Sequence, residues 1–179
     1  LQQNFMADVY IQAAIRQEIV VQIIRNHVPV KLYGHNWDTF LTKAEVLMKE
    51  DLTFIKEHVK DCGEVTYGEL PAIYNNARLS INQLPWFKAG MHDRTPLALM
   101  NGCVSITDGS IYMRREIPMD SGVEYYSLDE LEKVGEKIKS LVADVGSMKE
   151  KVARGVQYAE DMWSWKHWAV EFVEAAKEC

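Results

Sequence analysis

The order of apolar and polar positions predicts helices and short strands through the first third of the chain. Apolar residues recur at helical spacing over residues 6–26. The run Val-Pro-Val-Lys-Leu-Tyr-Gly at 28–34 predicts a short buried strand that ends at a glycine. Residues 39–50 are predicted to form a helix, and residues 64–67 a short edge strand. The first third therefore predicts a helix–strand–helix–strand order.

The remaining two thirds continue this alternation. The elements predicted there are a helix over 70–78, a strand over 79–82, a helix over 95–101 ending at Gly102, a strand over 103–106, a turn at 107–110, a strand over 123–126, and helices over 128–142, 147–160 and 164–177. Such alternation is typical of parallel βαβ units with helices on both faces of the sheet. We therefore predict a three-layer α/β/α Rossmann-like domain over residues 1–179, with a mostly parallel sheet of about five strands and residues 147–179 as C-terminal helices.

Composition excludes several classes of protein. The chain is 47% hydrophobic and 26% charged, with a formal net charge of -6. An acidic balance argues against nucleic acid or an anionic membrane as the partner. No apolar run approaches the roughly 20 residues that span a bilayer. The three cysteines are far apart and form no zinc or disulfide pattern, so we expect a cytoplasmic protein without a metal or a transmembrane segment.

The strongest candidate for binding chemistry is the segment at 86–96, Trp-Phe-Lys-Ala-Gly-Met-His-Asp-Arg-Thr-Pro, which follows a predicted strand and opens a predicted helix. A helix N-terminus presents unpaired amides to an anion. Gly90 permits close approach of a ligand, Arg94 can grip phosphate oxygens with two parallel N–H bonds, and His92 offers another donor. The alternative is that Asp93 caps the helix while Arg94 pairs with a surface carboxylate.

Two other segments offer polar groups near the ends of predicted strands. Gly34 and His35 follow the first strand, where a glycine permits close approach to a diphosphate or a sugar. The alternative there is a plain turn. In the second segment, which begins at Val65, Thr66 can bond the edge of a base and Tyr67 can stack on a base or a sugar. The alternative is that Tyr67 packs beside the next helix.

Other signals point to packing or are missing. Trp163, Trp165 and Trp168 cluster at the start of the last predicted helix, a pattern that favours core packing or a docking surface over a ligand cage. The sequence contains no glycine-rich phosphate loop, no dinucleotide fingerprint and no nucleophile elbow. No grouping of His, Cys and carboxylates has metal-ligand spacing.

Three segments stand in an order and spacing that is specific when they are taken together. They are 76–82 (Asn-Ala-Arg-Leu-Ser-Ile-Asn), 85–94 (Pro-Trp-Phe-Lys-Ala-Gly-Met-His-Asp-Arg) and 100–108 (Met-Asn-Gly-Cys-Val-Ser-Ile-Thr-Asp). Together they resemble the carboxy-terminal half of bacterial group 1 glycosyltransferases, most of all the subgroup similar to spore-maturation glycosyltransferases. Residues 32–37, 69–74 and 164–166 extend this resemblance over nearly the whole chain.

The resemblance implies the type B glycosyltransferase fold, in which two Rossmann-like domains face a cleft and the second holds a nucleotide-sugar. The sequence begins at Leu1, directly in a predicted helix. We therefore expect an N-terminal acceptor-binding domain to precede it in a longer protein and to be its partner in catalysis. In this family, basic side chains and backbone amides bind the donor diphosphate without an obligatory metal. The expected ligand is a nucleotide-diphosphate sugar, used as substrate, with no cofactor and little activity for this part alone.

Functional positions of the family fall on three segments of this chain. They are Gly90, His92, Asp93, Arg94 and Thr95 beside the donor, Gly34 and His35 after the first strand, and Val65, Thr66 and Tyr67 facing the base. Many retaining relatives have two glutamates near the first of these segments, where residues 88–97 contain none. The catalytic set expected here is therefore His92, Asp93 and Arg94. Arg94 and His92 would stabilise the charge that develops on the diphosphate, while Asp93 fixes one of them or binds a sugar hydroxyl.

Three other classes of function stay open on sequence grounds. One is a non-catalytic flavodoxin-like regulatory or interaction domain, the second is half of a nucleotide-sugar epimerase, and the third is a degenerate, purely structural domain. Response regulators of the first kind place acidic residues at the end of the first strand, where this chain has no acid before Asp38. That feature counts against the regulatory domain.

Overall fold

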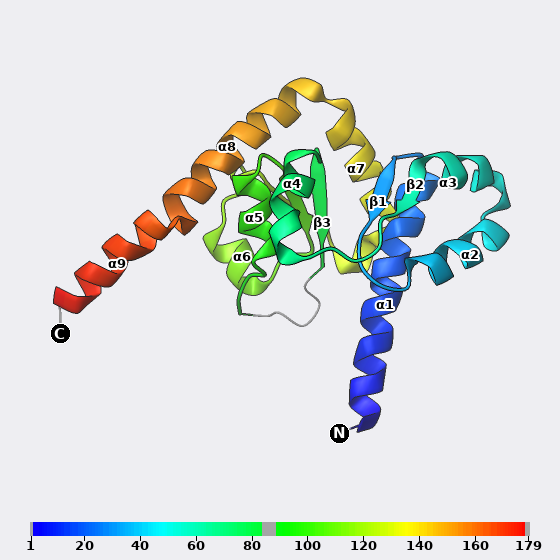
Figure 1. The fold of residues 1–179 in the computed structure, drawn as a ribbon, viewed down its shortest axis with the longest axis horizontal. Helices are drawn as coiled ribbons and strands as arrows, with labels where there is room; N and C mark the ends of the chain where they lie inside the picture. Colours follow the sequence, from blue (N-terminus) through cyan, green and yellow to red (C-terminus); the bar gives the residue numbers. More distant parts are fainter. Residues whose placement is uncertain (1, 84–88, 178–179) are drawn as a thin grey trace. The chain divides into compact units, whose positions relative to one another are not determined.

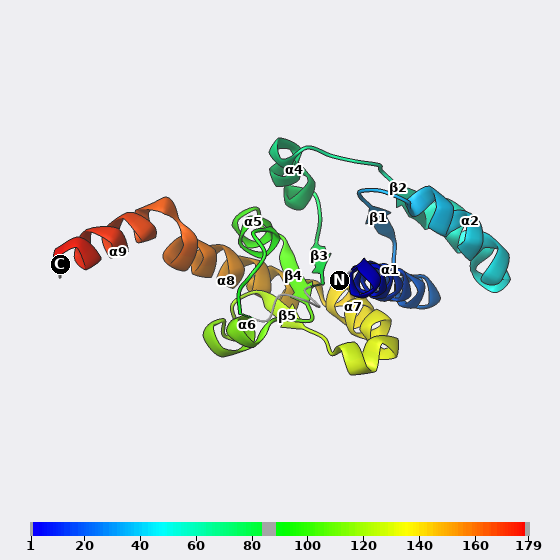
Figure 2. The same ribbon diagram turned by 90° about the horizontal axis from the view of Figure 1, so that it is seen from below.

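A computed structural model describes residues 2–83 and 89–177 and divides the chain into two compact units. The first unit contains the residues up to Gly68 together with Tyr126–Asp144. The second contains Glu69–Tyr125 together with the residues from Val145 onward. Both units combine helices with parallel strands (Figures 1 and 2).

The first unit is a two-stranded parallel sheet surrounded by helices. Its elements are α1 (Gln2–Arg25), β1 (Val30–Leu32), α2 (Trp37–Leu47), the 3₁₀ helix η1 (Lys49–Asp51), α3 (Leu52–His58), β2 (Val59–Asp61), the 3₁₀ helix η3 (Leu128–Lys133) and α7 (Val134–Ala143). A third 3₁₀ helix, η2 (Tyr67–Glu69), lies where the two units meet in the sequence.

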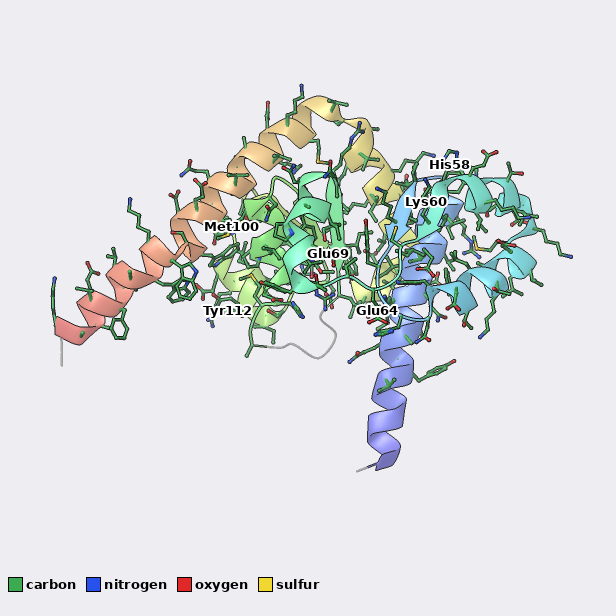
Figure 3. The ribbon with its side chains drawn as sticks, viewed as in Figure 1. His58, Lys60, Glu64, Glu69, Met100 and Tyr112 are labelled. Carbon is green, nitrogen blue, oxygen red and sulfur yellow. The ribbon has the colours of Figure 1, made fainter. Side chains whose placement is uncertain are left out.

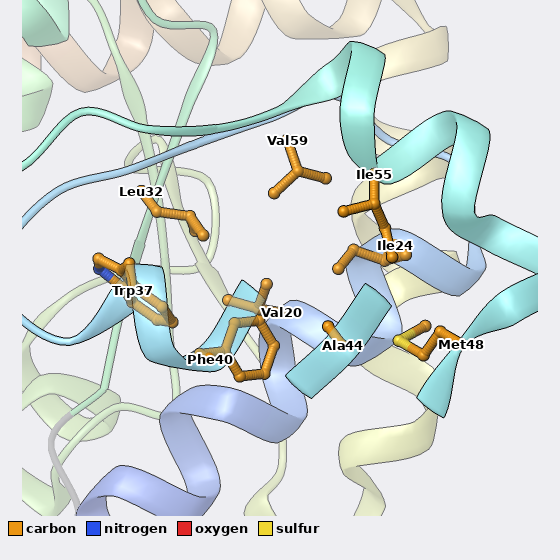
Figure 4. Packing of buried hydrophobic residues seen from close by; sticks show 9 residues of the cluster. All are labelled: Val20, Ile24, Leu32, Trp37, Phe40, Ala44, Met48, Ile55 and Val59. Carbon is orange, nitrogen blue, oxygen red and sulfur yellow. The ribbon is translucent and has the colours of Figure 1, made fainter. Parts of the chain in front are cut away.

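Apolar side chains of α1, α2 and α3 fill the core of the first unit against the two strands. Figure 4 shows this cluster, which consists of Val20, Ile24, Leu32, Trp37, Phe40, Ala44, Met48, Ile55 and Val59. The helix α7 also packs against α1. The two helices approach closely at Gly135, where an added Cβ would lie 2.1 Å from the carbonyl oxygen of Gln22. Only glycine therefore fits at this crossing.

The second unit is a three-stranded parallel sheet with helices packed against it. Its elements are α4 (Leu70–Asn75), β3 (Leu79–Asn82), α5 (Arg94–Met100), β4 (Val104–Thr107), α6 (Ile111–Glu116), β5 (Val123–Tyr125), α8 (Val145–Trp163) and α9 (Trp165–Lys177). The order β3–β4–β5 places β4 in the centre. All four residues of β4 are buried, as a central strand covered on both faces requires.

The end of α5 follows from the sequence Asn-Gly-Cys. Gly102 has a φ of 71°, in the left-handed region that favours glycine. Its amide donates to the carbonyl of Leu99 at 3.0 Å, and the Cys103 amide donates to the carbonyl of Ala98 at 3.0 Å. These two bonds define a Schellman motif, which turns the chain directly into β4.

The long C-terminal helix α8 crosses the second unit against α5 and β4 (Figure 1). Trp163 at its end packs on Tyr158 edge to face, with ring centroids 5.2 Å apart. In contrast, α9 has no buried residue, and Trp165 is 90% exposed. The expected packing of the tryptophan cluster is therefore seen for Trp163, whereas Trp165 and Trp168 are exposed.

The predicted α/β class, the parallel pairing and the helical C-terminal tail are confirmed. The described residues contain five strands, paired in parallel as a two-stranded and a three-stranded sheet. The predicted edge strand at 64–67 is wrong, because the strand lies at β2 instead. It ends in a turn in which Gly63 has a φ of 65° and donates to the Asp61 carboxylate at 2.9 Å.

Candidate functional site

The carboxyl edge of the sheet β3–β4–β5 gathers polar side chains. Because β3 leads into α5 and β4 into α6, both helices begin at this edge. Asn82 and Thr107 end their strands side by side, and both are buried. Asn82 Nδ2 donates to Ser105 Oγ at 3.2 Å, and Thr107 Oγ1 donates to the Asp108 carboxylate at 3.2 Å. In open α/β sheets, ligands bind at such an edge.

Three predicted catalytic residues form a contact chain where α5 begins. The Asp93 carboxylate pairs with Nδ1 of His92, and Nη2 of Arg94 lies 3.1 Å from Nε2 of the same ring. If Nδ1 carries the ring proton toward Asp93, Nε2 is free to accept from the guanidinium. The 3.3 Å approach of the Arg94 amide to Nδ1 is then a close contact and not a second hydrogen bond. Asp93 thereby orients His92, and His92 orients Arg94.

Arg94 is exposed, although its guanidinium is held in place. Among the described residues, no carboxylate forms an ion pair with it, and Asp93 makes no side-chain capping bond to α5. Both features of the alternative interpretation are therefore missing. Burial raises the pKa of the Tyr74 phenol, while its hydrogen bond with Ser80 and the charge of Arg94 lower it. A guanidinium has five N–H donors, so Arg94 retains donors beyond the one directed at His92.

Thr95 and Gly90 lie on either side of this contact chain. Thr95 is completely buried, and its Oγ1 has no hydrogen-bond partner among the residues that the structure describes. Its amide donates to the carbonyl of His92 at 3.1 Å and is therefore already paired. The helix α5 has only seven residues. The charged side chain of Arg94, and not the amide of Thr95, is consequently the group best placed to meet an anion.

The turn after β4 contributes a residue that the sequence did not identify as functional. Ser110 accepts from the Met113 amide at 3.0 Å, which caps α6, and its hydroxyl donates to the carbonyl of Gly90 at 2.5 Å. This bond brings the loop before α5 to the carboxyl end of β4. An N-cap serine was recognisable from the Asp-Gly-Ser sequence, but its distant partner was not.

Arg114 and Tyr125 stabilise the turn after β4. The guanidinium of Arg114 donates to the carbonyl of Asp108 at 2.6 Å and lies 4.9 Å from the ring centroid of Tyr125. Tyr125 in turn donates to the carbonyl of Met113 at 3.0 Å. Burial raises the pKa of Tyr125 to about 12, although the charge of Arg114 lowers it. Tyr125 is thus a neutral structural side chain at physiological pH.

The first unit has a carboxyl edge of its own, where Gly34 and His35 lie. The Gly34 amide donates to the carbonyl of Gly63 at 2.7 Å, so the loops after β1 and β2 stay side by side. His35 Nδ1 lies 2.9 Å from the Glu64 carboxylate, and both side chains are exposed (Glu64 is labelled in Figure 3). This pair offers polar groups to solvent beside a glycine whose φ is 107°.

The third predicted segment continues from this edge. Val65 is half-buried, whereas Thr66 and Tyr67 are exposed, and Tyr67 exposes 61% of its surface. Tyr67 begins η2 and so does not lie in a strand as expected. An exposed phenol ring of this kind is free to stack on a planar group. Val65, Thr66 and Tyr67 thus share the first unit with Gly34 and His35, while residues 90–95 belong to the second unit.

Part of the predicted loop at 83–91 lies outside the described residues. Pro85, Trp86, Phe87 and Lys88 of the predicted loop lie outside residues 2–83 and 89–177. Within those ranges, no three His, Cys, Asp or Glu side chains come together in a way that could hold a metal ion. Every helix in the same ranges is too short or too polar to cross a membrane.

Similar structures are known, although no protein-family model and no curated protein matches the sequence. The crystal structure of HepE from Anabaena in complex with UDP has a TM-score of 0.68 at 10% identity, over 88% of this chain and 44% of HepE. HepE with UDP and glucose gives a TM-score of 0.62 at 12% identity, and HepE with UDP-glucose 0.63 at 10%, over the same shares.

These likenesses show a shared fold, because identities of 10–12% support no more than that. The chain spans less than half the length of the HepE chain that it matches. The Rossmann-like α/β architecture expected from the resemblance to type B glycosyltransferases is therefore confirmed. The roles of individual residues, and the spore-maturation-like subgroup, stay predictions.

Proposed function

We propose that this chain is the part of a glycosyltransferase that holds a nucleotide-diphosphate sugar, and that Arg94 binds the diphosphate. The observation that supports this proposal most is the fold shared with HepE, whose crystal structures are in complex with UDP and UDP-glucose. The resemblance of residues 76–108 to group 1 glycosyltransferases points to the same ligand class. A spore-maturation-like subgroup and a bacterial source belong to this proposal.

The second support is the electrostatics of the loop before α5. Breaking the anomeric bond of a nucleotide-sugar leaves negative charge on the diphosphate, and a preorganised donor lowers that barrier. Arg94 is exposed at a carboxyl sheet edge and is oriented through His92 and Asp93, so little reorganisation is needed when an anion arrives. Gly90 and Thr95 would contribute to the shape of the same site.

The first unit offers groups of its own for contact with a nucleotide-sugar. At the sheet edge, Gly34 lets a ligand approach the backbone closely, and His35 offers a polar ring. Tyr67 offers an exposed ring for the base. Val65 and Thr66 would line the approach to that ring. No metal is needed in this scheme, since Arg94 supplies the positive charge.

Transfer to an acceptor hydroxyl also needs a general base in an inverting enzyme. In the type B architecture that group comes from the acceptor-binding domain, so we expect this part to bind nucleotide and to turn over little. Transfer and epimerisation use the same donor class. Analysis of the products formed by the longer protein would separate the two.

Calorimetric titration with UDP and GDP tests the proposal. We expect the parent chain to bind one of them, and Arg94→Ala to weaken that binding by about tenfold or more, as loss of a hydrogen bond to a charged group does. Arg154→Ala is the matched control, because it removes an exposed arginine of α8 in the same unit. Equal affinity in the parent and Arg94→Ala would remove Arg94 from the site, and no binding by the parent would contradict the proposal.

A further inference from the structure

The loop after β1, residues 33–36, has an unfavourable backbone conformation at two of its residues. Gly34 has a φ of 107°, and Asn36 has a φ of 64°. Asparagine tolerates the left-handed region better than most residues, but the conformation is still costly for a non-glycine residue. Moreover, Asn36 precedes α2 without making a side-chain capping bond. Contacts from outside the loop must therefore stabilise this conformation.

Those contacts converge on one backbone atom, the carbonyl oxygen of Tyr33. Nη2 of Arg16 donates to it at 3.1 Å from α1, and the indole Nε1 of Trp37 donates to it at 3.0 Å from α2. A carbonyl oxygen has two lone pairs, so both donors can be accommodated. The start of the loop is thus tied to two different helices.

Arg16 and Trp37 also hold each other. Cζ of Arg16 lies 4.1 Å from the centroid of the Trp37 ring, within the range of a cation–π contact. Trp37 is itself buried and packs edge to face on Phe40, with centroids 5.7 Å apart. The guanidinium is therefore stacked on a side chain that is anchored in the core.

Gly34 fits this arrangement in two ways. Its φ favours glycine, and an added Cβ would lie 3.2 Å from Nη2 of Arg16. A side chain at position 34 would therefore crowd the guanidinium, which would have to shift by a few tenths of an ångström. The Gly34 amide also donates to the carbonyl of Gly63. The loop that Arg16 contacts is therefore hydrogen-bonded to the loop after β2.

We propose that Arg16 is a positioning residue that holds loop 33–36 in the shape that receives the nucleotide-sugar. This inference rests on the proposed function, and it assigns a role to a residue of α1 that the sequence did not identify as functional. Lysine cannot replace arginine here, because a single ammonium cannot both donate to the Tyr33 carbonyl and stack flat on the Trp37 ring. A positive charge at position 16 is therefore not sufficient, and the planar guanidinium is required.

The test compares Arg16→Lys with Arg25→Lys, which makes the same substitution at an exposed position of the same helix. Three quantities are measured: the affinity for UDP by calorimetry, the midpoint of thermal unfolding, and the position of the Trp37 indole N–H resonance. That resonance is assigned with Trp37→Phe, which keeps an aromatic face for Arg16 but loses the donor to Tyr33.

We expect Arg25→Lys to match the parent in all three measurements. Arg16→Lys should bind UDP about tenfold more weakly and displace the indole resonance, while it unfolds at nearly the parent temperature. Trp37→Phe should also weaken UDP binding. An unmoved indole resonance, or an unchanged affinity in Arg16→Lys, would overturn the role of Arg16 and leave the proposed function intact. Failure of the parent to bind UDP or any other nucleoside diphosphate would overturn both.

Discussion

The hydroxyl of Ser110 donates a 2.5 Å hydrogen bond to the carbonyl oxygen of Gly90, and the same oxygen of Ser110 caps α6 by accepting from the Met113 amide. One side chain thus fixes both the start of α6 and the loop that leads to Arg94. The two residues are 20 positions apart, and Ser110 follows β4. The position of the loop before α5 therefore depends on a contact with the segment after β4.

Ser110→Ala is expected to lower both stability and nucleotide affinity. Loss of an N-cap destabilises a protein by about 1 kcal/mol. Loss of the bond to Gly90 also releases the loop before α5, so UDP binding should weaken several-fold. Urea unfolding and calorimetry measure the two effects.

Ser127→Ala is the matched control for this prediction, since Ser127 accepts from the Asp129 amide at the start of η3. It should cost a similar amount of stability and leave UDP affinity unchanged. If both variants weaken UDP binding equally, the tether between Ser110 and Gly90 has no specific effect on the loop.

Gly122→Ala is expected to destabilise the chain strongly. Gly122 has a φ of 80°, and an added Cβ would lie 2.6 Å from the Cα of Gly155 in α8. Backbone strain and overpacking together should cost about 3 kcal/mol. In Gly68→Ala the new Cβ meets nothing within 4 Å, so the free energy of unfolding should change by less than about 1 kcal/mol. Similar losses in the two variants would contradict the tight packing of α8 at Gly122.

Alkaline pH is expected to lower the free energy of unfolding, and titration of Cys103 contributes to this decrease. Burial raises the pKa of this thiol from 9.0 to about 12, so the folded state keeps its proton where the unfolded chain has lost it. The corresponding stability is fully present below about pH 9 and is lost as the pH rises toward 12.

Urea unfolding at several pH values between 8 and 11 measures this effect. Cys103→Ala should show a shallower fall in unfolding free energy than the parent, while Cys62→Ala, at an exposed cysteine, should follow the parent. Equal slopes in the parent and Cys103→Ala would show that Cys103 titrates normally in the folded state.

Features of the fold with local causes could be predicted from the sequence. The strand β3 lies at residues 79–82 as expected, and α5 ends at Gly102 as expected, where the structure shows a left-handed backbone. The alternation of strands and helices gave the α/β class, because that signal depends only on neighbouring residues. In contrast, β2 is a short strand whose last two residues are exposed, so its pattern resembles a loop. It is defined only by its pairing with β1.

In the candidate site, too, contacts between sequence neighbours could be predicted, whereas contacts between distant residues could not. His92, Asp93 and Arg94 are adjacent in sequence, and the contact chain among them could be anticipated from residue types alone. The contacts of Ser110 with Gly90 and of Arg16 with Tyr33 join positions 20 and 17 residues apart. No spacing rule relates such residues, since only the folded chain brings them together.

The central claim is that a nucleoside diphosphate binds at the carboxyl edge of β3, beside Arg94. It is tested most directly by following the backbone amide resonances of the ¹⁵N-labelled chain during titration with UDP. The account predicts saturable shifts at Gly90–Thr95 and Asp108–Ser110, in addition to those expected at loop 33–36, and the shifts at Gly90–Thr95 are lost in Arg94→Ala. Shifts confined to other parts of the chain, or none at millimolar UDP, would contradict it.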